Sequence, residues 1–158
     1  MKLKLLKSAV AMGVAATVIA SAPAAASDNR TITVNANITA VCKFFTASPV
    51  INVTNTGTGA NIDPSAAGPA TGNVGVTYRC TNGTTPNFTV PTSTTLSGSG
   101  ATPPTMSATV TSSNTGNGTG LGSGKDQTLT VTASIPQTTY ENAVVGNYTG
   151  SIVVSVSP

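Results

Sequence analysis

The chain has 158 residues, of which 39% are hydrophobic, 4% aromatic and 7% charged, and it contains no histidine. After removal of a leader, this length corresponds to one domain with a single core. Its formal net charge of +3 comes from Lys2, Lys4 and Lys7, and residues 27–158 carry four basic and four acidic side chains, which gives no basic patch for nucleic acid or an anionic membrane.

The first 26 residues have the pattern of a secretory signal peptide. A basic start, MKLKLLK, is followed by the apolar run SAVAMGVAATVIASA and by the small residues of APAAAS, so we place cleavage after Ala26. The apolar run could instead be a membrane anchor, but it is short for a span of about 20 residues. We therefore expect an exported mature chain of residues 27–158.

The mature chain begins with a strand pattern at residues 31–38. Four small or apolar side chains, those of Ile32, Val34, Ala36 and Ile38, alternate with polar ones. This period of two is typical of a strand with one buried face. On periodicity alone, the simplest interpretation is an ordinary first strand that packs within its own domain.

Further strand patterns follow at short spacing, with turn residues between them. They include the region of Cys42 and Phe44 and residues 50–54, 73–80, 87–91, 106–113, 127–136 and 146–158. Such spacing is typical of an all-β sandwich or barrel, and no segment has a convincing helical period. The Gly-rich and Ser-rich residues 96–104 and 114–126 are expected to be turns or flexible loops.

Two cysteines, Cys42 and Cys80, are expected to form a disulfide, because the exported compartment is oxidising. Closing a loop of about 39 residues would stabilise the fold by about 4 kcal/mol on the entropic model. A reactive or metal-binding pair is the alternative. It lacks support, since the chain has no histidine and no C-x-x-C spacing.

Little in the sequence points to catalysis, and we expect no catalytic, cofactor or metal site. The usual general base, histidine, is absent, and no nucleophile motif occurs. The four acids Asp28, Asp63, Asp126 and Glu141 show no paired spacing. The aromatic residues could form a sugar-binding platform, but on scattered strands they favour packing; they are Phe44, Phe45, Tyr78, Phe88, Tyr140 and Tyr148.

Three features taken together resemble the spore coat protein U domain family, the pilin subunits of archaic chaperone-usher pili. They are the alternating strand before the first cysteine, a second cysteine about forty residues later in NVGVTYRCTNG, and the terminal GNYTGSIVVSVSP. The resemblance covers nearly the whole mature chain. The chain departs from the usual pattern in its longer Gly-rich and Asn-rich loop at residues 111–124.

The resemblance implies an incomplete immunoglobulin-like β-sandwich at residues 41–158, completed by a donor strand from a neighbouring subunit. The N-terminal extension, residues 27–40, would be the donor, with Ile32, Val34, Ala36 and Ile38 as the inserted side chains. The groove that accepts it would be flanked by the final strand, residues 151–157. Ile152, Val154 and Val156 share one face of that strand, and Val153 lies on the other.

The function implied is that of a structural subunit of a bacterial surface fibre that serves adhesion or biofilm formation. The expected partners are other copies of the chain, a periplasmic chaperone and an outer-membrane usher. The protein would pass through the periplasm and end in a cell-surface fimbrium. The alternative is a self-contained secreted β-sandwich that binds a ligand such as a carbohydrate.

Overall fold

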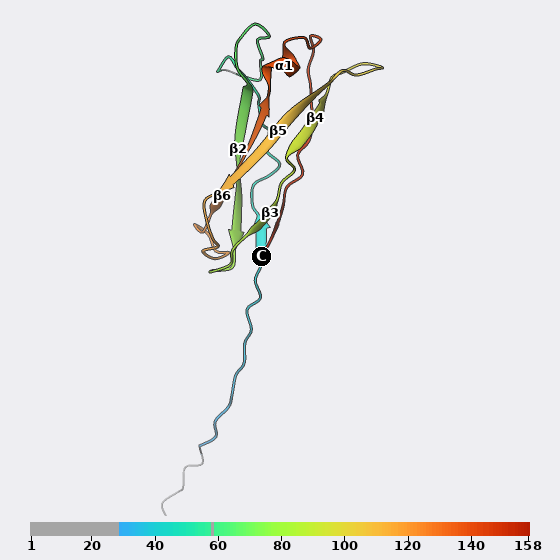
Figure 1. Ribbon diagram of the computed structural model, residues 1–158. Helices are drawn as coiled ribbons and strands as arrows, with labels where there is room; N and C mark the ends of the chain where they lie inside the picture. The colour runs from blue at the N-terminus through green and yellow to red at the C-terminus, as the bar shows by residue number, and fades with distance from the viewer. Residues whose placement is uncertain (1–28, 58) are drawn as a thin grey trace, which may run out of the picture. The chain divides into compact units, whose positions relative to one another are not determined.

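The computed structural model describes residues 29–57 and 59–158. The predicted signal peptide, residues 1–26, lies outside the described residues. The chain divides into two units, residues 1–36 and 37–158. The fold is that of the second unit, drawn in Figure 1, whose elements are β1 (Cys42–Phe44), β2 (Ala70–Cys80), β3 (Asn87–Thr89), β4 (Ser93–Ser97), β5 (Thr105–Asn114), β6 (Gln127–Ile135), α1 (Gln137–Tyr140) and β7 (Ser155–Ser157).

The strands form two antiparallel sheets. The larger has five strands in the order β1-β2-β6-β5-β4, and the smaller pairs β3 with β7. The longest pairing joins β2 to β6, from Ala70 opposite Ile135 to Tyr78 opposite Gln127. Because the four-residue α1 is the sole helix among the described residues, the expectation of an all-β chain is confirmed. No helix in that part of the chain is long and apolar enough to cross a membrane.

The core follows from the alternation along β6. Leu129, Val131, Ala133 and Ile135 are all buried, whereas the Thr and Ser residues between them are only partly covered. This is the period-two pattern of a strand with one face in the core. The two sheets also touch through aromatic rings, since Phe88 of β3 packs edge-on against Tyr78 of β2 with 4.9 Å between ring centroids.

One end of the unit, here called the disulfide end, is closed by the bond between Cys42 and Cys80. The predicted disulfide is confirmed: the two cysteines are direct partners across β1 and β2. The Gly-rich loop at residues 115–126 is fastened to this end. Gly118 N donates to Thr84 O at 2.7 Å, and Gly120 N donates to Cys80 O at 3.0 Å.

The opposite end, here called the α1 end, is organised around Tyr140. Its hydroxyl lies 2.5 Å from the carbonyl oxygen of Gly68 and 3.0 Å from that of Ala66, and it accepts a hydrogen bond from Asn55 Nδ2 at 3.1 Å. Asn55 Oδ1 in turn accepts from the backbone N–H of Asp63 at 2.8 Å. These bonds hold the long loop before β2 against the helix.

Four segments differ from the sequence-based expectation. β4 was not expected, because Leu96 is its sole large apolar residue. In residues 50–54, a single bridge joins Thr54 to Thr71. In the C-terminal segment, Thr149 bridges Ser97, and the ladder with β3 begins only at Ser155. No strand covers residues 29–41.

Candidate functional site

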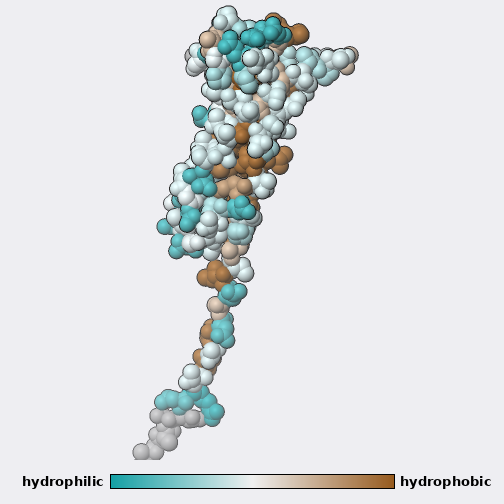
Figure 2. Space-filling view, viewed as in Figure 1, coloured by the Kyte–Doolittle hydropathy of each residue, from teal (hydrophilic) through white to brown (hydrophobic). Residues whose placement is uncertain are grey.

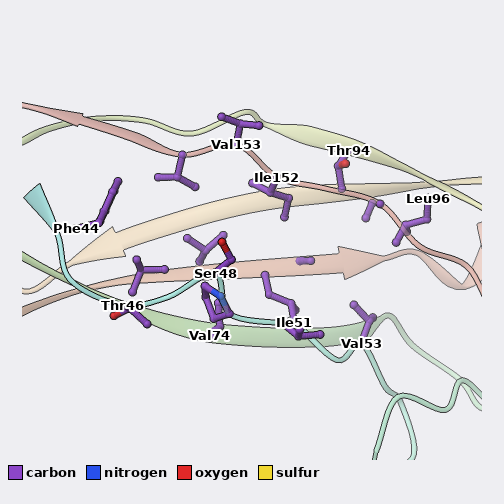
Figure 3. Close-up of a pocket in the computed structure, with 18 residues that line it drawn as sticks. Phe44, Thr46, Ser48, Ile51, Val53, Val74, Thr94, Leu96, Ile152 and Val153 are labelled. Carbon is purple, nitrogen blue, oxygen red and sulfur yellow. The ribbon is translucent and has the colours of Figure 1, made fainter.

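An apolar groove of about 510 Å³ opens along the second unit, between residues 46–53 on one side and 150–154 on the other. Figure 3 shows Ile51 and Val53 directed into it from the first wall, and Ile152 and Leu96 from the opposite side. The floor comes from the larger sheet. Its lining is Phe44, Thr46, Ser48, Pro49, Val50, Ile51, Val53, Val74, Val76, Thr94, Leu96, Ala108, Val131, Ala133, Gly150, Ile152, Val153 and Val154.

Two glycines set the positions of the groove walls. A Cβ on Gly72 would lie 2.2 Å from the carbonyl oxygen of Asn52, and a Cβ on Gly150 would lie 2.6 Å from that of Thr95. Any side chain would therefore push backbone away from backbone. The absence of a Cβ lets the first wall lie on β2 and the second wall lie on β4.

The walls carry backbone groups that no strand pairs. Within residues 29–57 and 59–158, no backbone-to-backbone hydrogen bond involves residues 47–53 or 150–154. The carbonyl of Ser151 accepts instead from the Thr94 hydroxyl at 2.8 Å. Extended segments with unpaired N–H and C=O groups are templates for adding another strand.

The floor of the groove is shaped by residue size. Val74, Val76 and Val131 fill part of it, whereas Ala108 and Ala133 leave depth. None of the described residues that line the groove is charged, and Figure 2 shows hydrophobic side chains gathered part-way along this face of the unit. The groove therefore suits an apolar occupant.

The groove continues into a second cavity of about 660 Å³ toward the α1 end. The two share Val50, Ile51, Val53, Leu96 and Gly150. The second cavity is also lined by two strongly exposed valines, Val144 and Val145, with 67% and 97% of their surfaces accessible. An extended apolar segment seated in the groove could therefore reach the α1 end.

The predicted acceptor residues occupy different places. Ile152 and Val154 line the groove, but Val156 lies beyond it and pairs with Phe88 of β3. Val153 is 79% exposed and also lies at the groove edge. The floor residues and the wall at residues 46–53 are not predicted as part of a site by the sequence. Their inward faces are nevertheless indicated by the alternation in residues 50–54, 73–80, 106–113 and 127–136.

The predicted donor residues lie outside any strand. Ile32, Val34 and Ile38 are 84%, 85% and 84% exposed, and Ala36 is exposed as well. The structure therefore leaves all four alternating side chains exposed. They form an apolar stripe on a segment without secondary structure.

The described residues give little support to a metal site or an aromatic binding platform. Among the described residues, no group of three or more His, Cys, Asp or Glu side chains could hold a metal ion. Tyr78 and Tyr140 are buried, and Phe44 packs near Phe88 with 6.4 Å between centroids, so these rings do not form a platform. The pKa of Asp63 is lowered by hydrogen bonds from the Ser65 hydroxyl and backbone N–H.

Comparisons with protein-family models, with curated proteins and with solved structures find no match to this chain.

Proposed function

We propose that this chain is the structural subunit of a bacterial surface fibre, assembled by donor-strand exchange. The observation that carries the proposal is the apolar groove, whose two walls are extended and unpaired. The fold proposed is an immunoglobulin-like β-sandwich that lacks one strand. Residues 31–38 of a neighbouring copy would supply that strand.

The chemistry of the donor segment matches the groove. Strand addition takes its affinity from main-chain hydrogen bonds and its specificity from alternate side chains that enter pockets. Ile32, Val34, Ala36 and Ile38 alternate with polar residues, so one face of the segment is apolar. An eight-residue strand extends about 26 Å, and the groove together with the second cavity runs toward the α1 end of the unit.

The side chains also fix the register of the donor. A slip of one residue would turn Asn35 and Asn37 toward the apolar floor, where their amides would lack partners. Burial of Ile32, Val34 and Ile38 would contribute roughly 5 to 9 kcal/mol before the cost of ordering the segment. One register is therefore strongly favoured.

The contact is head-to-tail, because each copy donates one surface and accepts with another. Such heterologous contacts generate an open filament when the rotation between successive copies does not close a ring. Until a neighbour arrives, the groove needs a temporary occupant. We therefore assign a periplasmic chaperone, an outer-membrane usher and other copies of the chain as partners, with export to the periplasm and a final place in a cell-surface fimbrium.

The test compares two substitutions in the donor segment. Val34→Asp places a charge on the apolar face and should abolish fibres while export continues, because burial of an unpaired carboxylate is costly. Asn35→Asp adds the same charge on the opposite face and should leave the fibre yield close to that of the unmodified chain. Fibre yield from cells expressing each variant, with secreted protein as the export control, is the measurement. Equal yields from the two variants would contradict the proposal.

A further inference from the structure

The charged side chains of residues 37–158 give the two ends of the unit net charges of opposite sign. Lys43, Arg79, Lys125 and Asp126 lie at the disulfide end. Three cations against one acid give this end a side-chain charge of +2. Arg79 Nε contacts Asp126 Oδ1 at 2.5 Å, so the excess positive charge lies on the two exposed lysines. A carboxylate at Pro158 would lower the total to +1 without changing its sign.

The two remaining charged residues, Asp63 and Glu141, lie at the α1 end and give it a charge of −2. Glu141 directly follows α1, and Asp63 is tied to the helix through Asn55 and Tyr140. Both carboxylates are exposed. The 11-residue β2 separates the two ends, which is about 35 Å of strand. The unit is therefore an electrostatic dipole along its strands.

The donor segment leaves from the positive end without a spacer. Val41 N donates to Thr81 Oγ1 at 3.0 Å, and Thr81 N donates to Val41 O at 2.9 Å. Thr81 Oγ1 also donates to Thr39 O at 3.4 Å. Because Ile38 immediately precedes this anchored stretch, a neighbour whose groove holds Ile38 must lie against the disulfide end of the donor.

Two orientations of the donor in the groove can be distinguished. If it runs antiparallel to residues 149–157, Ile38 reaches the α1 end of the acceptor, and the +2 end of one subunit meets the −2 end of the next. If it runs parallel to them, two +2 ends meet. Charge complementarity favours the first arrangement. The exposed Val144 and Val145 lie at the same end and offer an apolar contact.

We propose that successive subunits dock head to tail, with Lys43 and Lys125 of one subunit facing Asp63 and Glu141 of the next. The partner is a second copy of this chain. This inference rests on the proposed fibre function and adds to it a second contact, separate from the inserted strand. That contact sets the direction of the donor.

Carbodiimide cross-linking of purified fibres tests the docking directly, because this reagent joins a lysine to a carboxylate that it touches. Within one subunit, Lys43 and Lys125 are separated from Glu141 by about the length of β2, roughly 35 Å. A cross-link between them must therefore join two subunits. We expect mass spectrometry to find Lys43 or Lys125 joined to Glu141 or Asp63. Intact fibres that yield no such cross-link would overturn the docking.

A charge exchange gives a second readout. Glu141→Lys and Lys43→Glu should each slow fibre assembly about tenfold at low ionic strength, with a smaller effect at high salt, and the double variant should recover part of the rate. Asn142→Gln is the uncharged control. If the unmodified chain forms no fibres, the proposed function fails. If it forms fibres whose assembly rate is the same in all variants, only the docking fails.

Discussion

Filling the floor of the groove should separate the stability of the subunit from its ability to polymerise. Ala133 is buried and lines the floor of the groove. Ala133→Leu adds three carbons, worth about 2.4 kcal/mol at about 0.8 kcal/mol per buried CH₂. Overpacking against β2 and β5 would cancel part of this gain. We expect a net stabilisation of the isolated subunit by about 1 kcal/mol, or about 4 °C in Tm.

The same leucine should impair assembly, because it occupies volume that a donor side chain would fill. Loss of one fully buried apolar side chain costs about 1.5 to 3 kcal/mol, which is roughly a tenfold to hundredfold loss in the strength of each junction. Thr132→Leu, on the opposite face of β6, is the matched control. Thermal unfolding of monomers and electrophoresis of unheated fibres give the two readouts. A stabilised Ala133→Leu subunit that polymerises as well as the unmodified chain would show that no donor side chain occupies the space above Ala133.

Three further outcomes follow from local contacts. Reduction of the Cys42–Cys80 bond, which links residues 38 apart in sequence, should lower the free energy of unfolding by about 3 to 4 kcal/mol, measured by denaturant titration with and without reductant. Tyr140→Phe should lower the free energy of unfolding by about 1 to 3 kcal/mol, because the partly buried carbonyls of Ala66 and Gly68 lose their donor. Tyr148→Phe, whose hydroxyl donates to an exposed turn, should lower it less in the same titration. The pKa of Asp63 is lowered below its ordinary value of 3.8, so the stability that its carboxylate gives to the loop is present above pH 3.8 and is lost as the pH falls through the lowered pKa. Proteolysis of the loop in the unmodified chain should therefore increase as the pH falls through that range. In Asp63→Asn, proteolysis should depend less on pH.

The sequence predicted those strands that alternate over a buried face. β2, β5 and β6 fall where residues 73–80, 106–113 and 127–136 alternate. β2 begins earlier than expected, at Ala70, whereas the ends of β5 and β6 lie within one residue of the expected ends. The sequence pattern does not predict β4, because its Ser and Thr residues are typical of a loop. Its position depends on pairing with β5, such as Leu96 opposite Met106, and this is tertiary information.

The groove was harder to foresee than the sheets. Residues 50–54 and 151–157 were predicted as strands, and most of their backbone groups are unpaired, since no strand of the described part of the chain lies between the two segments. Alternation identifies which side chains face inward, but it does not show whether a backbone has a partner. The close approaches at Gly72 and Gly150, which place the two walls, likewise depend on packing between distant segments.

Exchange of strands between subunits can be detected by electrophoresis of the purified mature protein. One sample is loaded without heating and one after boiling. We expect a ladder or very large species in the first and a single monomer band in the second, because an inserted strand resists detergent until the subunits unfold. A monomer in both lanes, even after long incubation without a chaperone, would rule out strand exchange and place the donor segment within its own domain.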